Sequence, residues 1–408
     1  MCCKKREFLK EGIRLKHKEK RAKTILTLEG LVTYKRAVYV PADEESARLL
    51  AEKYGMKMVV PLDIALGLSQ LPFKISVAMM LDIAKRSVNA HSYEELQRSY
   101  KEDWNIEISD DQLRLVTNYI GKLVYDDDCL RKDNALDHFK RRKNSGKRKS
   151  GVLYIEMDGA MLNTRKSENG STWKENKLGL VFSSKNIRNF KSESGQEYHK
   201  ILSREYISYI GNADTFKEHL YAMALRNGLE EHEKIVVVSD GAAWIKSFLT
   251  TYCSELDAIQ ILDYTHLKEN IFKFANACIR GGKKAKTAWG TKLKELVKAG
   301  KISEALKMAE PYKDFKREGI PNIYTYLDNN KECIDYPAYV TKGYFIGSGA
   351  IESGNRSTMQ ERLKLPGMRW DVETAQYVLS AKMKYDSGLW DSYVVPLVYK
   401  HFGLRPPY

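Results

Sequence analysis

The sequence has few cysteines, and their spacing favours neither a metal site nor a disulfide framework. Six cysteines occur in 408 residues, with no CxxC pair and no close histidine, so we expect neither a zinc ribbon nor a disulfide-stapled fold. No uncharged run approaches the roughly 20 residues that a membrane-crossing helix needs. The N-terminus MCCKKREFLKEGIRLKHKEKR has no apolar segment behind its charges. These absences argue against secretion and membrane insertion, and they fit a reducing cytoplasm.

Acidic residues are also in deficit relative to basic ones. Lys and Arg number 68 against 53 Asp and Glu, which gives a formal net charge of +15 and a pI near 9.2. A balance of this kind favours anionic partners such as nucleic acid or acidic membrane surfaces, and charge alone does not choose between them. The length predicts two or three domains with ample material for a core.

The first third of the chain predicts a small β element followed by helices. Residues 1–22 have the composition of a basic, helix-like arm, and 24–40 alternate apolar and polar residues around Glu29–Gly30, which predicts a β-hairpin. Residues 73–124 change to helical spacing, with Ser92 and Ser109 at N-cap positions. Three short helices in this order resemble a helix-turn-helix DNA-binding bundle, and a plain helical bundle without DNA contact fits equally well.

The basic segment 138–151 has linker composition and predicts a domain boundary; it is either a solvated tether or a strap that contacts phosphates. Beyond it the pattern is α/β. Three strand candidates that can form a meander precede an alternation of helices and strands, which is the order of an RNase H-like mixed sheet flanked by helices. The candidate strands are 152–158, 178–184, 197–210, 234–241 and 258–263, with helices over 213–229, 242–252 and from about His266. Residues 280–340 are helical and basic, and we expect them to form an all-α insertion.

Two acids end strands in the same local context. Asp158 is followed by Gly159–Ala160 and Asp240 by Gly241–Ala242, at the strand ends where α/β sheets place their sites. The predicted sheet order makes their strands neighbours. Two adjacent carboxylates repel unless a cation lies between them, and Mg²⁺ prefers such hard oxygen ligands. Taken singly, Asp–Gly after a strand is often a turn, and an acid such as Glu352 near a helix start is favoured by the helix dipole.

Four motifs together resemble the DDE transposases of bacterial insertion sequences. They are YIEMDGAML, VVVSDGAAWI, ILDYTHLKENI and GSGAIESGNRSTMQERLKLPGMRW, and the similarity spans about residues 150–390. The resemblance implies that Asp158, Asp240 and Glu352 form a catalytic, metal-binding triad for Mg²⁺, with Mn²⁺ as a substitute. It also implies that the segment between Asp240 and Glu352 is the helical insertion of that group. Members often carry more sequence before the hairpin, so we expect this chain to start late or to be a truncated copy.

Further residues are candidates for auxiliary roles. Asp263 either caps the helix that follows it, or marks a turn from which His266 faces the metal cleft and positions a phosphate or a water. Arg356 lies one helical turn after Glu352 and is the second auxiliary candidate. The cations expected to contact DNA are Lys283, Lys284, Lys286, Arg362, Lys364 and Arg369.

The expected function is Mg²⁺-dependent DNA cleavage and strand transfer at insertion-sequence ends by a bacterial cytoplasmic transposase, acting on double-stranded DNA as a homodimer or higher oligomer. The alternatives are a structure-selective RNase H-like nuclease and a catalytically idle DNA-binding descendant. The expected domains are a basic arm and β element (1–72), a helical domain (73–137), the linker (138–151), the catalytic core in two parts (152–279 and 341–408, the latter with C-terminal helices) and the insertion (280–340).

Overall fold

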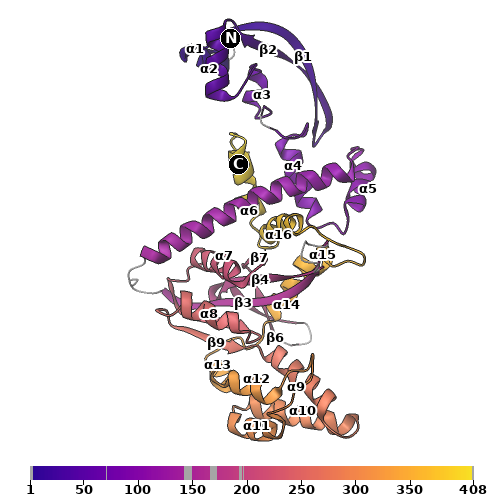
Figure 1. Cartoon of the computed structure of the whole chain (residues 1–408), viewed down its shortest axis with the longest axis vertical. Helices are drawn as coiled ribbons and strands as arrows, with labels where there is room; N and C mark the ends of the chain where they lie inside the picture. The colour runs from indigo at the N-terminus through magenta and orange to yellow at the C-terminus, as the bar shows by residue number, and fades with distance from the viewer. Residues whose placement is uncertain are drawn as a thin grey trace. The chain divides into compact units, whose positions relative to one another are not determined.

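The chain divides into two compact units. The structure, a computed structural model, describes residues 3–69, 71–141, 149–165, 172–192, 195 and 197–406. One unit comprises Met1–Asp126 with Tyr377–Tyr408, and the other comprises Asp127–Gln376 (Figure 1). These limits differ from the predicted ones, because α6 (Asp110–Arg141) and α16 (Val372–Asp386) are continuous helices that each run from one unit into the other. Residues 142–148 of the predicted linker lie outside the described residues.

The N-terminal hairpin is confirmed but is longer than predicted. Strands β1 (Leu15–Thr27) and β2 (Gly30–Pro41) pair antiparallel, and Thr27 lies opposite Gly30, whose φ of +91° suits the turn. The helix-like arm predicted over 1–22 is wrong beyond its first part, since α1 (Cys3–Lys10) ends before β1 begins. The charged stretch pairs with β2 along its length, and this long-range ladder overrides local composition.

Helices form the rest of the first unit. The predicted trio is present as α4 (Val77–Ser87), α5 (Tyr93–Trp104) and α6, and the hydroxyls of Ser92 and Ser109 accept the N–H groups of Glu95 and Gln112 as N-caps. The third helix is wrong in length, because α6 has 32 residues. The remaining helices are α2 (Glu44–Tyr54), α3 (Pro61–Ala65), the π-helix η5 (Trp390–Val394) and α17 (Val395–His401).

The second unit contains the predicted mixed sheet. Its five strands lie in the order β7-β4-β3-β8-β9, with β3 antiparallel to β4, β4 antiparallel to β7, and β3, β8 and β9 mutually parallel. This is the order predicted for an RNase H-like sheet. The first and fourth predicted strands, which correspond to β3 and β8, are neighbours. The strands are β3 (Lys149–Asn163), β4 (Trp173–Ser183), β7 (Glu205–Ile210), β8 (His232–Ser239) and β9 (Ala258–Leu262).

The side chains of β3 alternate between the two faces of the sheet. Leu153, Ile155 and Met157 pack in one core with α7 (Ala213–Arg226), α8 (Ala243–Tyr252) and the end of α6. Successive strand residues point to opposite faces, so Tyr154, Glu156 and Asp158 face the other way. That second face meets α14 (Gly349–Gly354), whose Ile351 N–H is bonded to Glu156.

The predicted insertion consists of helices joined by turns and loops, the longest of them over 313–322. It follows α9 (Tyr264–Cys278) and holds α10 (Lys283–Lys298), α11 (Ile302–Ala309), α12 (Ile323–Asn329) and α13 (Tyr336–Thr341), with short 3-10 turns η2 (Glu310–Tyr312) and η3 (Lys331–Cys333). After α14 come the π-helix η4 (Asn355–Gln360) and α15 (Glu361–Leu363). A 3-10 turn η1 (Ser184–Asn186) and a separate hairpin of β5 (Ile187–Lys191) and β6 (Glu197–Ile201) lie between β4 and β7. Across the described residues, no helix combines the length and apolar character that crossing a bilayer requires.

Candidate metal centre

Asp158 lies inside β3, because the strand continues past it to Asn163, so the strand end predicted at Asp158 is wrong; its side chain lies where helix α14 gives way to η4. Its Oδ1 accepts the N–H of Gly159 at 2.7 Å, and its Oδ2 accepts the side-chain amide of Asn355, the first residue of η4. Burial raises the pKa of Asp158, and the Asp240 carboxylate adds to that effect. The side chain is therefore held from two sides and lies within electrostatic reach of the second predicted acid.

Asp240 follows strand β8 directly. The parallel ladder of β3 and β8 ends at Glu156 and Val238, two residues before Asp158 and Asp240 in each segment. The Oδ1 atom of Asp240 accepts the N–H of Ala242 at 3.0 Å. Gly241 has a φ of +87°, and a Cβ there would lie 2.8 Å from the Asn330 side-chain oxygen, so this turn requires glycine for its backbone and its packing.

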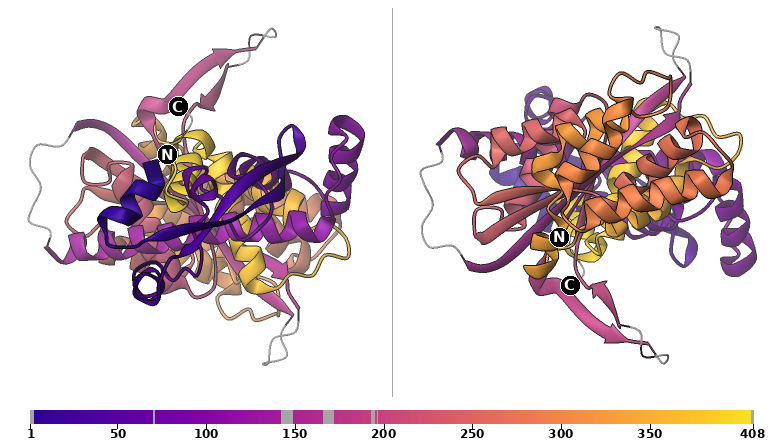
Figure 2. Two further views of the ribbon diagram at one scale, coloured as in Figure 1. Left: turned by 90° about the horizontal axis from the view of Figure 1, so that it is seen from above. Right: turned by 90° about the horizontal axis from the view of Figure 1, so that it is seen from below.

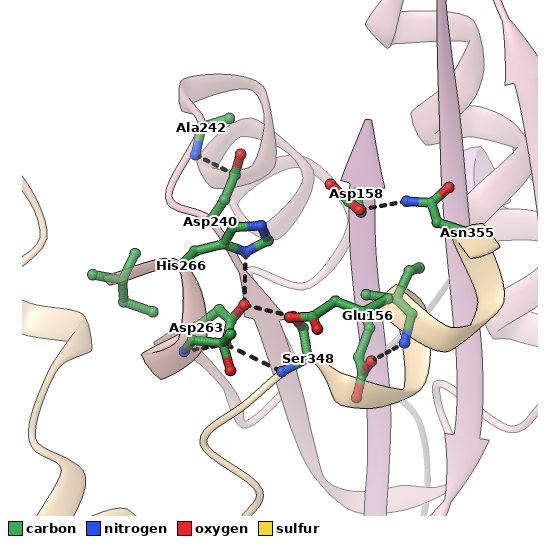
Figure 3. Close-up of polar contacts among 12 residues, drawn as sticks. Glu156, Asp158, Asp240, Ala242, Asp263, His266, Ser348 and Asn355 are labelled. Carbon is green, nitrogen blue, oxygen red and sulfur yellow. Dashed lines mark hydrogen bonds and ion pairs between the residues drawn. The ribbon is translucent and has the colours of Figure 1, made fainter. Parts of the chain in front are cut away.

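The third acid lies beside an Asp–His pair. Asp263, His266 and Glu352 each offer a ligand atom, and these atoms all lie within 4.8 Å of one another. The Nδ1 atom of His266 is 2.6 Å from Oδ2 of Asp263. The hydroxyl of Ser348 donates to Asp263 at 2.5 Å and also lies 3.3 Å from Oε1 of Glu352. Figure 3 shows His266 and Asp240 across from Asp158, with Asp263 and Ser348 below them.

The charged states of His266 and Asp263 stabilise each other. The contact with Asp263 raises the pKa of His266 to about 9 against the effect of burial, with Asp158 and Asp240 adding to the increase. Burial acts to raise the pKa of Asp263, but contacts with His266, Ser348 and the Thr265 N–H outweigh it and hold the pKa low. An imidazolium thus lies among carboxylates from β3, β8, β9 and α14, a region whose acids outnumber its cations.

Three strand acids hold the segment that carries Glu352. Glu156 accepts the Ile351 N–H at 2.9 Å, Asp263 accepts the Ser348 N–H at 3.2 Å, and Asp158 accepts the Asn355 amide. Glu156 is 1% exposed, and burial raises its pKa to about 8, so it is protonated at neutral pH. These contacts orient α14 on the sheet and bring Glu352 beside Asp263 and His266.

The structure separates the predicted triad into two sets. Asp158 and Asp240 influence each other and His266 electrostatically, whereas Glu352 lies in the Asp263–His266–Glu352 group, which includes neither of those acids. The cap alternative for Asp263 is confirmed, because Oδ1 accepts the Thr265 N–H at the start of α9, while Oδ2 contacts His266. The role of His266 toward a phosphate or a water stays a prediction. Arg356 is exposed on η4, where the π-helical turn changes the spacing expected of an α-helix.

The predicted DNA-contacting cations have different environments. Lys283 and Lys284 are exposed and line a hollow of about 650 Å³ on α10. Lys286 donates to the Asn276 carbonyl oxygen at 2.7 Å. Arg362 is 2% exposed with its guanidinium 5.1 Å from the Trp370 ring centroid, so this side chain is a packing residue and is not available at the surface. Lys364 and Arg369 are exposed, and their contact with DNA stays a prediction.

Sequence reasoning missed three residues of this region. The sequence prediction takes Asp263 as a cap or a marker for His266 and not as a possible ligand, although it directly follows a strand, as Asp240 does. Glu156 is two residues before Asp158 on the same strand face, a spacing that alternation makes visible. Asn355 had no sequence signal, because its contact with Asp158 joins residues 197 positions apart.

The donor set suits a hard divalent cation. Carboxylate oxygens are the ligands that Mg²⁺ and Mn²⁺ prefer. Asp263 and Glu352 are the acids whose oxygens lie close enough to hold such an ion together, and Asp158 and Asp240, which lie outside that group, are the nearby acids that could join them. A comparison with curated proteins finds no match. The sequence matches one family description over residues 7–391. Since this match covers most of the chain, the protein belongs to the uncharacterised protein family UPF0236.

Proposed function

We propose that the protein is a metal-dependent DNA-cleaving and DNA-joining enzyme of the DDE transposase type. The observation that carries the proposal is the group formed by Asp263, His266 and Glu352, with Asp158 and Asp240 near enough to raise the pKa of His266. Four acids at one sheet edge are unfavourable together unless a cation compensates them. Phosphoryl transfer is the chemistry in which such a carboxylate-held cation is most useful.

Each side chain has a role in that reaction. Asp158 of β3 and Asp240, which follows β8, would help to hold the cation, and Asn355 fixes the orientation of Asp158. Glu352 completes the site from α14. When bound, Mg²⁺ supplies Lewis acidity to a phosphoryl oxygen and lowers the pKa of a water molecule. His266, kept protonated by Asp263, supplies a positive charge and a hydrogen-bond donor to a substrate phosphate.

The bond changes are those of two in-line displacements. Water attacks the phosphorus, the bond from phosphorus to O3′ breaks, and a 3′-hydroxyl and a 5′-phosphate result. The 3′-hydroxyl then attacks a phosphorus of target DNA, losing its proton, and the target's own 3′-oxygen leaves and takes up a proton. Both displacements use the same ligands, so one site serves cleavage and joining.

The test uses the full chain and duplex DNA that carries both flanks of its own gene. Cleavage and joining are followed on labelled DNA in Mg²⁺, and binding is followed in Ca²⁺. We expect wild type to cleave and to join, and Asp240→Asn to bind DNA without doing either. The matched control is Asp328→Asn, which removes an exposed acid of α12 that pairs with Lys331 at 3.2 Å, and it should behave as wild type.

Other outcomes separate the alternatives. Cleavage that never leads to joined products would identify a nuclease and reject the strand-transfer half of the proposal. DNA binding by wild type without any cleavage in Mg²⁺ or Mn²⁺ would reject the catalytic proposal and favour a DNA-binding descendant. Equal cleavage by wild type and Asp240→Asn would remove that residue from the site.

A further inference from the structure

The β5–β6 hairpin is a two-stranded ribbon separate from the five-stranded sheet. Its register pairs Arg188 with Lys200 and Phe190 with Tyr198. Figure 2 shows the hairpin extending away from the sheet and helices of its unit in both views. A two-stranded hairpin alone is marginally stable in water, so its cross-strand pairs have to hold it together.

The hairpin has an inner and an outer face. The His199 ring lies 5.8 Å from that of Phe345, which in turn packs on Tyr154 of β3, and Ile187 and Ile201 are half-buried. Because strand residues alternate in direction, the intervening positions point outward. We call the outward set the cationic face; it consists of Arg188, Phe190, Tyr198 and Lys200, all of them exposed.

The charges on the cationic face are unfavourable in the isolated protein. Arg188 and Lys200 are directly opposite each other, and like charges at such a pair destabilise a hairpin. Among the described residues neither cation pairs with a carboxylate; Arg188 donates to the carbonyl oxygens of Lys185 and Ile187 at 3.0 and 3.1 Å. Segment 184–204 holds five Lys and Arg against two Glu. An anionic partner would relieve this repulsion.

The aromatic pair gives the face a fixed geometry. The Phe190 and Tyr198 rings stack at 5.7 Å with an interplanar angle of 21°, and Nζ of Lys200 lies 5.5 and 5.8 Å from the two centroids. Stacking of this kind stabilises the hairpin, and the cation over the rings limits the positions of the Lys200 ammonium group. The Lys200 charge is therefore held over the aromatic pair, on the same face as Arg188.

The start of the hairpin lies along β4 from the level of Asp158. It leaves the sheet after Ser183, which pairs with Leu153, while Leu178 pairs with Asp158. Five strand residues separate these levels, which corresponds to about 17 Å at about 3.3 Å per residue. For a duplex that runs parallel to β4, an advance of about 3.4 Å per base pair puts the start of the hairpin about five base pairs from Asp158.

We propose that the cationic face of the β5–β6 hairpin binds the sugar–phosphate backbone of duplex DNA, roughly five base pairs or more from the phosphate that is cut. The position relative to the cut rests on the proposed function, whereas the contact between the hairpin and DNA does not. The contact is electrostatic, so it positions the duplex without reading its sequence.

The test measures the salt dependence of DNA binding in Ca²⁺, where turnover is not needed. For Arg188→Gln/Lys200→Gln we expect the slope of log K against log salt to fall by about 2, with affinity near 0.1 M salt reduced about eightfold for each lost contact. The control Lys301→Gln/Lys331→Gln removes two cations that already pair with Glu304 and Asp328, and its slope should match that of wild type. The charge-conserving Arg188→Lys/Lys200→Arg should also bind as wild type does.

Folding and position are checked separately. Removing two opposed cations should leave the thermal melting temperature unchanged or slightly higher, so lost binding cannot be assigned to unfolding.

Shortening the duplex to fewer than about five base pairs on one side of the cut should abolish the difference in DNA affinity between wild type and the double variant. An unchanged salt slope in the double variant, or tighter binding to single-stranded than to duplex DNA, would overturn the proposal even if the enzyme cleaves. A hairpin effect on binding in a protein that never cleaves would uphold the contact and reject the proposed activity.

Discussion

Glu156→Gln should change how the stability of the second unit depends on pH. Glu156 is 1% exposed, and burial raises its pKa from 4.5 to about 8. The unfolded chain therefore loses this proton at lower pH than the folded protein does. The stability that wild type gains from the protonated carboxyl is complete below about pH 4.5 and is lost as pH rises to about 8. Glutamine keeps the shape and an oxygen for the Ile351 N–H, but it does not titrate.

The size of the effect follows from the shift. Each pH unit inside this window changes the free energy of unfolding by about 1.4 kcal/mol. Between pH 5.5 and pH 7.5 the stability of wild type relative to Glu156→Gln should therefore fall by about 2.7 kcal/mol. Other groups that titrate in this range, including His266, are present in both proteins and largely cancel in the difference.

Urea unfolding followed by tryptophan fluorescence measures this difference. Four of the six tryptophans, Trp173, Trp244, Trp289 and Trp370, belong to the second unit, so the signal reports mainly on it. Chelator is included so that no metal charge contributes. Glu304→Gln, which alters an exposed carboxylate of α11, is the control and should show no such trend. A difference between wild type and Glu156→Gln that stays constant within about 0.5 kcal/mol from pH 5.5 to 7.5 would refute the assignment of Glu156 as a buried, neutral acid.

Three further predictions concern the turn, the insertion and the acid of α14. Gly241→Ala should destabilise the second unit by about 1–3 kcal/mol, because φ is +87° and the new Cβ would meet Asn330; an unchanged urea midpoint would contradict this. Lys283→Gln/Lys284→Gln should lower the salt slope of DNA binding by up to about 2, and a wild-type slope would exclude these lysines from the interface. Glu352→Gln should weaken Mn²⁺ binding in calorimetry while DNA binding is retained. Arg356→Ala should weaken DNA binding while Mn²⁺ binding is retained. Equal Mn²⁺ affinity in wild type and Glu352→Gln would show that Glu352 is a surface acid and not a metal ligand.

Local patterns predicted much of the scaffold. The β-branched runs ending in Asp158 and Asp240 predicted adjacent strands, and β3 and β8 are parallel neighbours. Ser92 and Ser109 predicted helix starts, because capping involves groups only three residues apart. These features depend on short-range hydrogen bonding and on side-chain alternation, both of which are present in the order of residues itself.

Features that depend on contacts between residues far apart in the chain could not be predicted from local patterns. The arm predicted as helical is partly strand β1, since its charged residues find ladder partners on β2. Helix α6 continues to Arg141 because its later turns pack Ala135 against the sheet core. Arg362 looked like a surface cation in a basic stretch, but Trp370 covers it. In each case packing with distant residues outweighed composition.

The sequence by itself determined that Asp240 and Asp263 lie where strands end, that Asp263 can cap α9, the order of the strands, and the strongly basic balance of the chain. Tertiary structure alone decided that β3 continues past Asp158, that Asp263 contacts His266, that Glu156 is buried beneath α14, and that the hairpin cations Arg188 and Lys200 lie opposite one another. The reason is physical. A residue's intrinsic preference is set by its neighbours along the chain, whereas its charge state and its partners are set by groups that approach only when strands pair and a helix docks on the sheet.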